Sequence, residues 1–157
     1  MNLRRHRTMR DDRWVEPRTS LIGREPELAR IEGHVRSTQL VTLSGPGGVG
    51  KTRLAIETAR RLEPEAGGGV HVVDLAPLPL DSTRDEVGEA LVSTMGLTSI
   101  ESVVGALQQQ PTLLLFDNCE HLRDGVAELV ESLLEVDSEL RVLATSRIAL
   151  DLSLIHI

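Results

Sequence analysis

The chain has almost no aromatic side chains: Trp14 and Phe116 are the only two among its 157 residues. Proteins that bind single-stranded nucleic acid stack bases on aromatic rings, so we expect no such platform here. A single cysteine, Cys119, excludes an internal disulfide and a cysteine-rich metal site. No apolar run approaches the length of a membrane span, and no signal peptide is visible. We therefore expect a cytoplasmic protein without membrane contact.

Basic residues are fewer than acidic ones, 17 against 24. The net charge of −7 argues against a general surface for polyanions. The hydrophobic content of 40% and charged content of 26% are ordinary for a globular protein, and the length suits one domain. Of the 17 lysines and arginines, Lys51 is the only lysine. Lys51 thus provides the only lysine ammonium group, which is more compact than the guanidinium of arginine.

That lysine belongs to a glycine-rich motif with the G-x-x-x-x-G-K-[ST] pattern of a phosphate-binding loop. An apolar run at 40–43 precedes it and predicts a buried strand. Apolar residues at helical spacing follow it between Leu54 and Leu62. Strand, loop and helix are the context that the motif requires. The motif residues are Gly45, Pro46, Gly47, Gly48, Val49, Gly50, Lys51 and Thr52.

Each part of the motif has a chemical task. Glycines let successive backbone N–H groups turn toward a phosphate, and the helix N-terminus adds its positive dipole end. Lys51 would reach the β- and γ-phosphates, and the Thr52 hydroxyl would hold Mg²⁺. Arg53 follows directly and is included among the expected nucleotide-binding residues. The sequence therefore predicts a site for a nucleotide and Mg²⁺.

A second informative stretch is Thr112 to Asp117, a continuous apolar run that ends in a carboxylate. Such a run is typical of a strand buried on both faces of a parallel sheet. It would bring Asp117 to the carboxyl edge of the sheet, where ligands bind in such folds. This is the Walker B pattern, and Asp117 would bind Mg²⁺ through water. Asp74 ends another predicted strand, and a loop-capping role is favoured there over a ligand role.

The remaining patterns alternate between strands and helices. Helices are predicted from Pro26 to Arg36, from Ile100 to Gln109 and around 126–134, and a further helix is predicted to end at Gly96. Strands are predicted at 70–75 and 141–145. This alternation predicts a three-layer α/β domain with a mainly parallel sheet and right-handed crossovers. Residues 1–18 form an arginine-rich leader that composition predicts to be disordered, with a nucleic-acid-binding arm as the alternative.

Five motifs in order resemble the NB-ARC-like STAND ATPases, and more narrowly the ATPase module of bacterial LuxR- and SARP-type transcriptional regulators. They cover about residues 19–148 and are Ile22 to Glu25, Gly45 to Thr52, Val73 to Leu78, Leu114 to Leu122 and Ala144 to Arg147. The resemblance implies a P-loop NTPase fold with strand order 5-1-4-3-2. It also implies that ATP and ADP are the ligands; the chain has no guanine-reading Asn/Thr-Lys-x-Asp motif.

Residue roles follow from the resemblance. Gly23 and Arg24 would lie against the adenine and ribose, and Arg147 would be a sensor of the γ-phosphate. A plain surface arginine is the alternative for Arg147. Hydrolytic relatives often carry a second acid after the magnesium aspartate, but here Asn118 stands there and cannot accept a proton at neutral pH. Glu120 or His121 could substitute, or could merely begin the next helix.

These features favour an ATP/ADP switch with slow or partner-stimulated hydrolysis over a constitutively hydrolysing AAA+-type ATPase. The tail at 149–157 does not resemble the family's continuation. We therefore expect a C-terminally truncated fragment in which the fifth strand is missing. The expected partners are regulatory domains of a longer parent protein, DNA only through segments outside this chain, and further copies of the chain in a nucleotide-dependent association.

Overall fold

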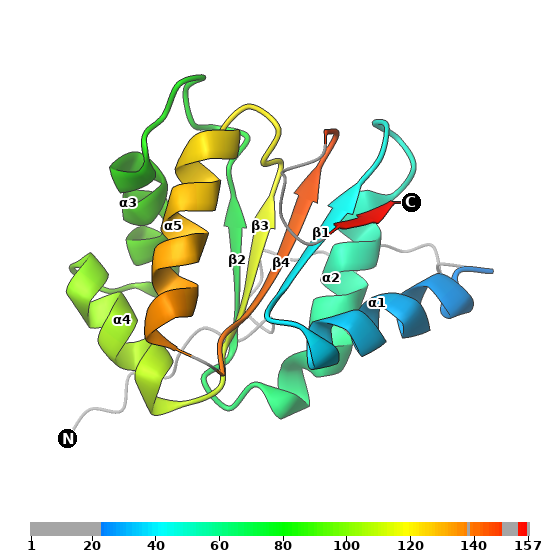
Figure 1. Ribbon diagram of the computed structural model, residues 1–157, viewed down its shortest axis with the longest axis horizontal. Helices are drawn as coiled ribbons and strands as arrows, with labels where there is room; N and C mark the ends of the chain where they lie inside the picture. Colours follow the sequence, from blue (N-terminus) through cyan, green and yellow to red (C-terminus); the bar gives the residue numbers. More distant parts are fainter. Residues whose placement is uncertain (1–22, 138, 149–153, 157) are drawn as a thin grey trace.

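A computed structural model describes residues 23–137 and 139–148, together with the backbone of residues 154–156. Its centre is a parallel sheet with helices on both faces (Figure 1). In chain order the elements are α1 Glu25–Ser37, β1 Leu40–Ser44, α2 Lys51–Leu62, the 3₁₀ turn η1 Glu63–Glu65, β2 Val70–Asp74, α3 Arg84–Met95, α4 Ile100–Gln109, β3 Leu113–Asp117, α5 Arg123–Val136, β4 Arg141–Ser146 and β5 Leu154–His156.

The strand order is β2-β3-β4-β1-β5, and every pairing is parallel. This confirms the expected order and the expected insertion of β4 between β1 and β3. The expectation that the fifth strand is missing was wrong, because Leu154–His156 pairs with Thr42–Ser44 along the outer side of β1. The physical reason is that β1 would otherwise present unpaired backbone groups at the sheet edge. The leader at 1–18 lies outside the described residues.

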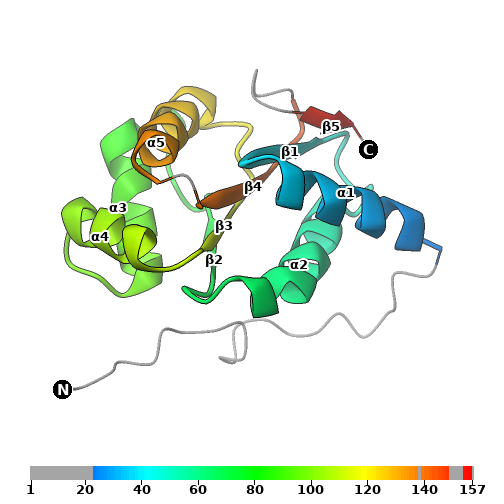
Figure 2. The same cartoon turned by 60° about the horizontal axis from the view of Figure 1, so that its bottom comes forward.

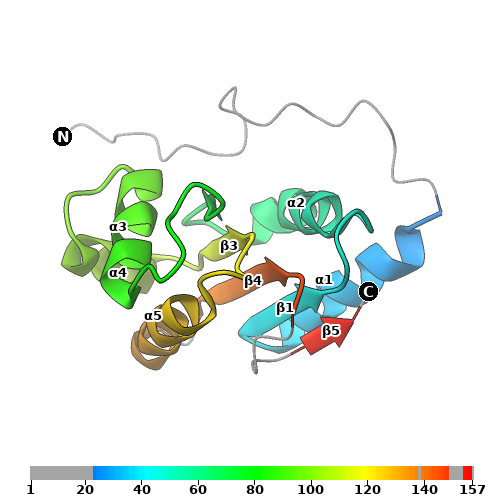
Figure 3. The ribbon, with the colours of Figure 1, turned by 90° about the horizontal axis from the view of Figure 1, so that it is seen from above.

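The sheet separates two apolar layers. Helices α3, α4 and α5 lie on one side and α1 and α2 on the other, and Figures 2 and 3 show the sheet between them. Alternation along β3 explains how one strand serves both layers: Leu114 and Phe116 enter the α3–α5 layer, whereas Leu113 and Leu115 enter the α1–α2 layer. All five residues of β3 are buried, as the continuous apolar run predicted.

Local signals define the helix ends. Pro26 lies in the first turn of α1, where its missing N–H costs nothing. Ser99 and Ser102 form a reciprocal capping box at the start of α4, and Gly96 ends α3 in the left-handed conformation. Among the described residues no single helix is long and apolar enough to cross a membrane. Only α3 and α4 together reach that length and composition, and they meet at a bend of 58°.

Candidate functional site

The glycine-rich loop connects β1 to α2 at the carboxyl edge of the sheet (Figure 1). Gly48 and Gly50 have φ values of +84° and +87°, which glycine adopts without the steric cost of a Cβ. A Cβ on Gly50 would also lie 2.9 Å from Nη1 of Arg24, and one on Gly47 would lie 3.2 Å from the Arg147 guanidinium. Two arginines from distant parts of the sequence therefore approach the loop where side chains are absent.

Lys51 is the first residue of α2 and is only 9% exposed. Its Nζ donates hydrogen bonds to the carbonyl oxygens of Gly45, at 2.7 Å, and Pro46, at 2.8 Å. The first turn of α2 contains no acidic residue. The ammonium group and the helix N-terminus thus concentrate positive potential inside the loop, which is an arrangement suited to a phosphate.

Asp117 ends β3 and lies beside this loop. The Thr52 hydroxyl donates to Asp117 Oδ1 at 2.9 Å, and the Thr145 hydroxyl donates to the same oxygen. Thr145 also accepts a hydrogen bond from the backbone N–H of Asn118 at 3.1 Å. No role was predicted for Thr145, although the predicted insertion of its strand beside the Asp117 strand was a signal that could have placed the two residues together.

Asn118 has φ +63°, a left-handed conformation that asparagine tolerates better than most residues. Its Nδ2 donates to Asp117 Oδ2 at 3.3 Å and to Asp74 Oδ1 at 3.1 Å. Asp74 also accepts the N–H of Ala76 at 3.0 Å, which confirms its loop-capping role. The contact with Asn118 is a second one, which sequence analysis did not anticipate.

Arg147 and Glu120 complete the site. The Arg147 Nε lies 3.6 Å from Glu120 Oε1, and the arginine side chain is 68% exposed. Together with the loop they bound a cavity of about 270 Å³. Its lining contains the predicted site residues Gly47, Gly48, Gly50, Lys51, Thr52, Arg53, Glu120 and Arg147. Asn118 and Thr145, which were not predicted as site residues, line it as well. His121 lies instead on a neighbouring cavity of about 570 Å³, which shares Glu120 with the first.

Arg24 approaches the loop from α1. Its Nη1 donates to the carbonyl of Val49, and its guanidinium pairs with Glu27 at 2.6 Å. Gly23, just before it, has φ +79°. The contact with Val49 brings the Arg24 guanidinium to the loop. The expected contact with adenine and ribose stays a prediction.

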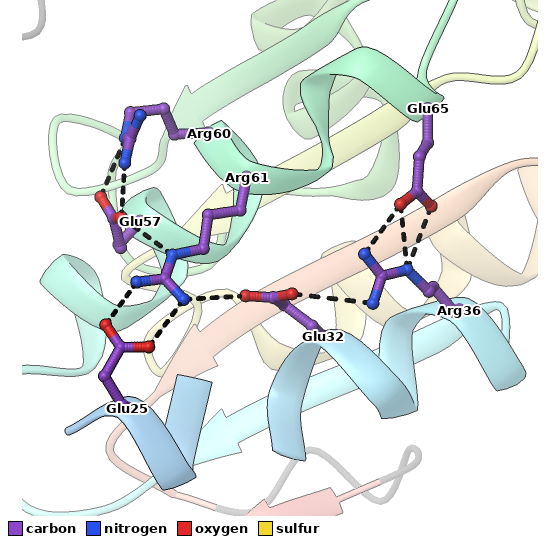
Figure 4. Close-up of polar contacts among 7 residues, drawn as sticks. All are labelled: Glu25, Glu32, Arg36, Glu57, Arg60, Arg61 and Glu65. Carbon is purple, nitrogen blue, oxygen red and sulfur yellow. Dashed lines mark hydrogen bonds and ion pairs between the residues drawn. The ribbon is translucent and has the colours of Figure 1, made fainter. Parts of the chain in front are cut away.

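Ion pairs attach α1 to α2 (Figure 4). Arg61 on α2 is the centre: its guanidinium lies 2.6 Å from Glu25, 3.0 Å from Glu57 and 3.3 Å from Glu32. The hydrogen bonds that Arg61 donates to Glu25 and Glu57 raise the pKa of its guanidinium. The network extends to Arg36, Arg60 and Glu65.

The donor set fits Mg²⁺. The hydroxyl of Thr52 and the carboxylate of Asp117 are hard oxygen ligands, 2.9 Å apart. Within the described part of the chain, no group of three or more His, Cys, Asp or Glu side chains could hold a metal. Mg²⁺ characteristically uses one or two protein ligands and completes its shell with phosphates and water. The geometry therefore suits a metal that enters with a nucleotide.

No family model matches the chain. An uncharacterized protein of Mycobacterium tuberculosis is 35% identical over 141 residues, which are 86% of this chain and 35% of that protein. A second protein of the same organism, named as a candidate HTH-type transcriptional regulator, is 41% identical over 112 residues, 69% of this chain and 12% of that protein. The chain thus spans about a third or less of the curated relatives it matches.

Solved structures share the architecture at low sequence identity. The Walker-type ATPase of Pyrococcus abyssi superposes with a TM-score of 0.60 and 20% identity over 79% of this chain and 45% of that one. A STAND protein with a tetratricopeptide repeat sensor from Pyrococcus horikoshii gives a TM-score of 0.56 and 19% identity, over 91% and 23%. With its parallel sheet and glycine-rich loop, the chain has the fold of the P-loop NTPases.

Proposed function

We propose that the chain is the ATP-binding module of a signalling or transcriptional regulator, in which ATP and ADP stabilise different conformations. The observation that carries the proposal is the juxtaposition of Lys51 with the Thr52–Asp117 pair. The ammonium group lies inside the loop, and the two magnesium-type ligands lie 2.9 Å apart beside it. A triphosphate and Mg²⁺ would be held there at the same time.

The proposed residue roles follow the geometry. The loop from Gly45 to Gly50 would surround the β-phosphate, Lys51 would bind the β- and γ-phosphates, and Thr52 and Asp117 would hold Mg²⁺. Arg147 would contact the γ-phosphate from the far side of the cavity. Arg24, which contacts the loop, and Arg53, which lines the cavity, would bind other parts of the nucleotide. The preference for adenine rests on the resemblance and on the two solved structures, both of which are named as ATPases.

The regulator role rests on the relatives. One is named as a candidate HTH-type transcriptional regulator, and this chain corresponds to 12% of its length. We propose that regulatory domains of a longer parent protein read the nucleotide state, that DNA is bound by segments other than this one, and that the nucleotide controls self-association. Hydrolysis would be slow or partner-stimulated because Asn118 stands where a carboxylate general base is expected.

Calorimetric titration of the chain with MgATP and MgADP tests the proposal, with Lys51→Ala beside the wild type and Arg60→Ala as the control on the same helix. Hydrogen bonds to charged groups contribute about 1.5–3 kcal/mol, so Lys51→Ala should weaken binding by about tenfold or more. Arg60→Ala should bind like the wild type. Binding unchanged by Lys51→Ala, or no binding by folded wild type, would contradict the proposal.

A constitutively hydrolysing ATPase is the second candidate, favoured by the position of Glu120 on the cavity wall. In that case the purified chain would turn over ATP at an appreciable rate, and Glu120→Gln would abolish turnover. Under the switch proposal, turnover of the purified chain is slow and survives that substitution.

A further inference from the structure

The amide of Asn118 lies between two carboxylates. Both Asp74 and Asp117 are acceptors when ionised, so the nitrogen of the amide must face them and its oxygen must face away. Each N–H of the Nδ2 group then has one carboxylate partner. Among the described residues no donor contacts Oδ1, and Asn118 lines the cavity between the loop and Arg147.

The backbone reinforces this orientation. Asn118 is held at φ +63°, and its N–H donates to the Thr145 hydroxyl at 3.1 Å. Asp74 is fixed in turn, since it ends β2 in register with Asp117 and accepts the Ala76 N–H at 3.0 Å. The amide is therefore positioned by the ends of three strands. Such support is what precise placement of a small reactant requires.

We propose that Asn118 orients the attacking water through Oδ1, and that Asp74 is the positioning residue that holds its amide in place. This inference rests on the proposed function and adds the residues responsible for its slow hydrolysis. An amide can accept a hydrogen bond from water but cannot take a proton at neutral pH. It supplies orientation without general-base catalysis.

The hydrolysis reaction needs no protein side chain as a base. The water oxygen forms a bond to the γ-phosphorus while the bond from that phosphorus to the β,γ-bridging oxygen breaks, and ADP leaves with that electron pair. One proton of the water stays on the inorganic phosphate, and the other is released to solvent. Asn118 holds the water before the attack and is unchanged afterwards.

Single-turnover hydrolysis and MgATP affinity of the whole chain test the inference. Asn118→Ala and Asp74→Ala should each slow hydrolysis by about tenfold or more, since small misplacements cost up to about 100-fold, with affinity changed less than about twofold. Asp74→Asn keeps an acceptor for the Asn118 amide and should recover part of the rate. Asp85→Ala, an exposed acid in the first turn of α3, is the matched control and should behave like the wild type.

Coupling separates positioning from a merely structural role. Because Asp74 acts through Asn118, Asp74→Ala should add little to Asn118→Ala in the double variant. Asn118→Asp introduces a titrating carboxylate, so the hydrolysis rate of this variant should rise with pH as that carboxylate ionises. The wild-type rate between pH 6 and pH 9 should show no such dependence on a carboxylate.

The possible failures are distinguishable. Wild type that binds no MgATP would refute the proposed function itself. Binding without single-turnover hydrolysis would overturn the inference alone. Wild-type rates in Asn118→Ala, or additive losses in the double variant, would also overturn it.

Discussion

The Arg147 Nε lies 3.6 Å from the Glu120 carboxylate, and its guanidinium is the closest group to the space that a side chain on Gly47 would occupy. The pair joins the end of β4 to the connection between β3 and α5 across the mouth of the cavity. A γ-phosphate entering that cavity would carry more negative charge than a single carboxylate. It would therefore compete with Glu120 for the arginine.

Replacing Arg147 with alanine should weaken MgATP binding by about tenfold while changing MgADP binding less than about twofold. The reason is that a charge-assisted contact to the γ-phosphate is available only in ATP. Parallel calorimetric titrations measure the ratio of the two affinities, with Arg60→Ala as the control. Unchanged affinities for both nucleotides would favour a plain surface role for Arg147, and equal losses would place its contact on a part that ATP and ADP share.

Replacing Glu120 with glutamine should tighten MgATP binding slightly, by about two- to fivefold. Exposed ion pairs contribute about 0.2–1 kcal/mol, and Arg147 would no longer be held by a charged partner. Titration gives the affinity, and phosphate release gives the rate. Loss of turnover in this variant would support the constitutive ATPase instead.

Replacing Gly50 with alanine should abolish nucleotide binding and destabilise the fold by about 1–2 kcal/mol, because a left-handed backbone is costly for a residue with a Cβ. The added methyl would also displace Arg24. Gly105→Ala is the control: this glycine lies inside α4, with nothing within 4 Å of an added Cβ. That change should stabilise the protein by about 0.5–1 kcal/mol. Chemical denaturation measures both, and a neutral Gly50→Ala would contradict the close approach.

Acid should weaken the ion pairs that Glu57 makes with Arg60 and Arg61 along α2. Hydrogen bonds from Arg60 and then Arg61 lower the pKa of Glu57 below its ordinary value of 4.5. A lowered pKa in the folded state stabilises the protein above the unfolded-state value, and that contribution is lost as pH falls through the folded-state value. Glu57→Gln should therefore cost less than about 1 kcal/mol at pH 7 and make the decline in unfolding free energy below pH 4.5 shallower.

Denaturation at several pH values tests this, with Glu131→Gln on α5, away from the network, as the control. Added salt should reduce the difference between Glu57→Gln and the wild type, because the network is largely exposed. If the unfolding free energy of Glu57→Gln declines below pH 4.5 as steeply as that of the wild type, the Glu57 carboxylate does not contribute to the pH dependence.

Much of the fold was predictable because its signals are local. The apolar run ending at Asp117, the glycine-rich loop and the caps at Gly96 and Pro26 each depend on neighbouring residues, and the structure contains the expected elements at those positions. The order of the strands came from the resemblance. The pairing of Leu154–His156 with β1 was missed because three residues carry no pattern of their own.

The site was less predictable where contacts cross between strands. From the sequence, Asn118 was identified only as a residue that cannot act as a base. Its contact with Asp74 depends on the register of β2 against β3. The contact of Thr145 with Asp117 depends likewise on β4 lying beside β3. Register is a property of the assembled sheet and not of any single strand.

The place of β4 between β1 and β3 also has a consequence for folding. Strand β4 lies between β3 and β1 and is encoded after both of these strands. During synthesis β1 and β3 leave the ribosome before their common neighbour β4 does, so the two apolar layers are incomplete until β4 arrives. Such distant pairings make folding slow compared with a chain of local contacts. The nascent chain therefore carries the open edges of β1 and β3 until residues 141–146 are available to close them.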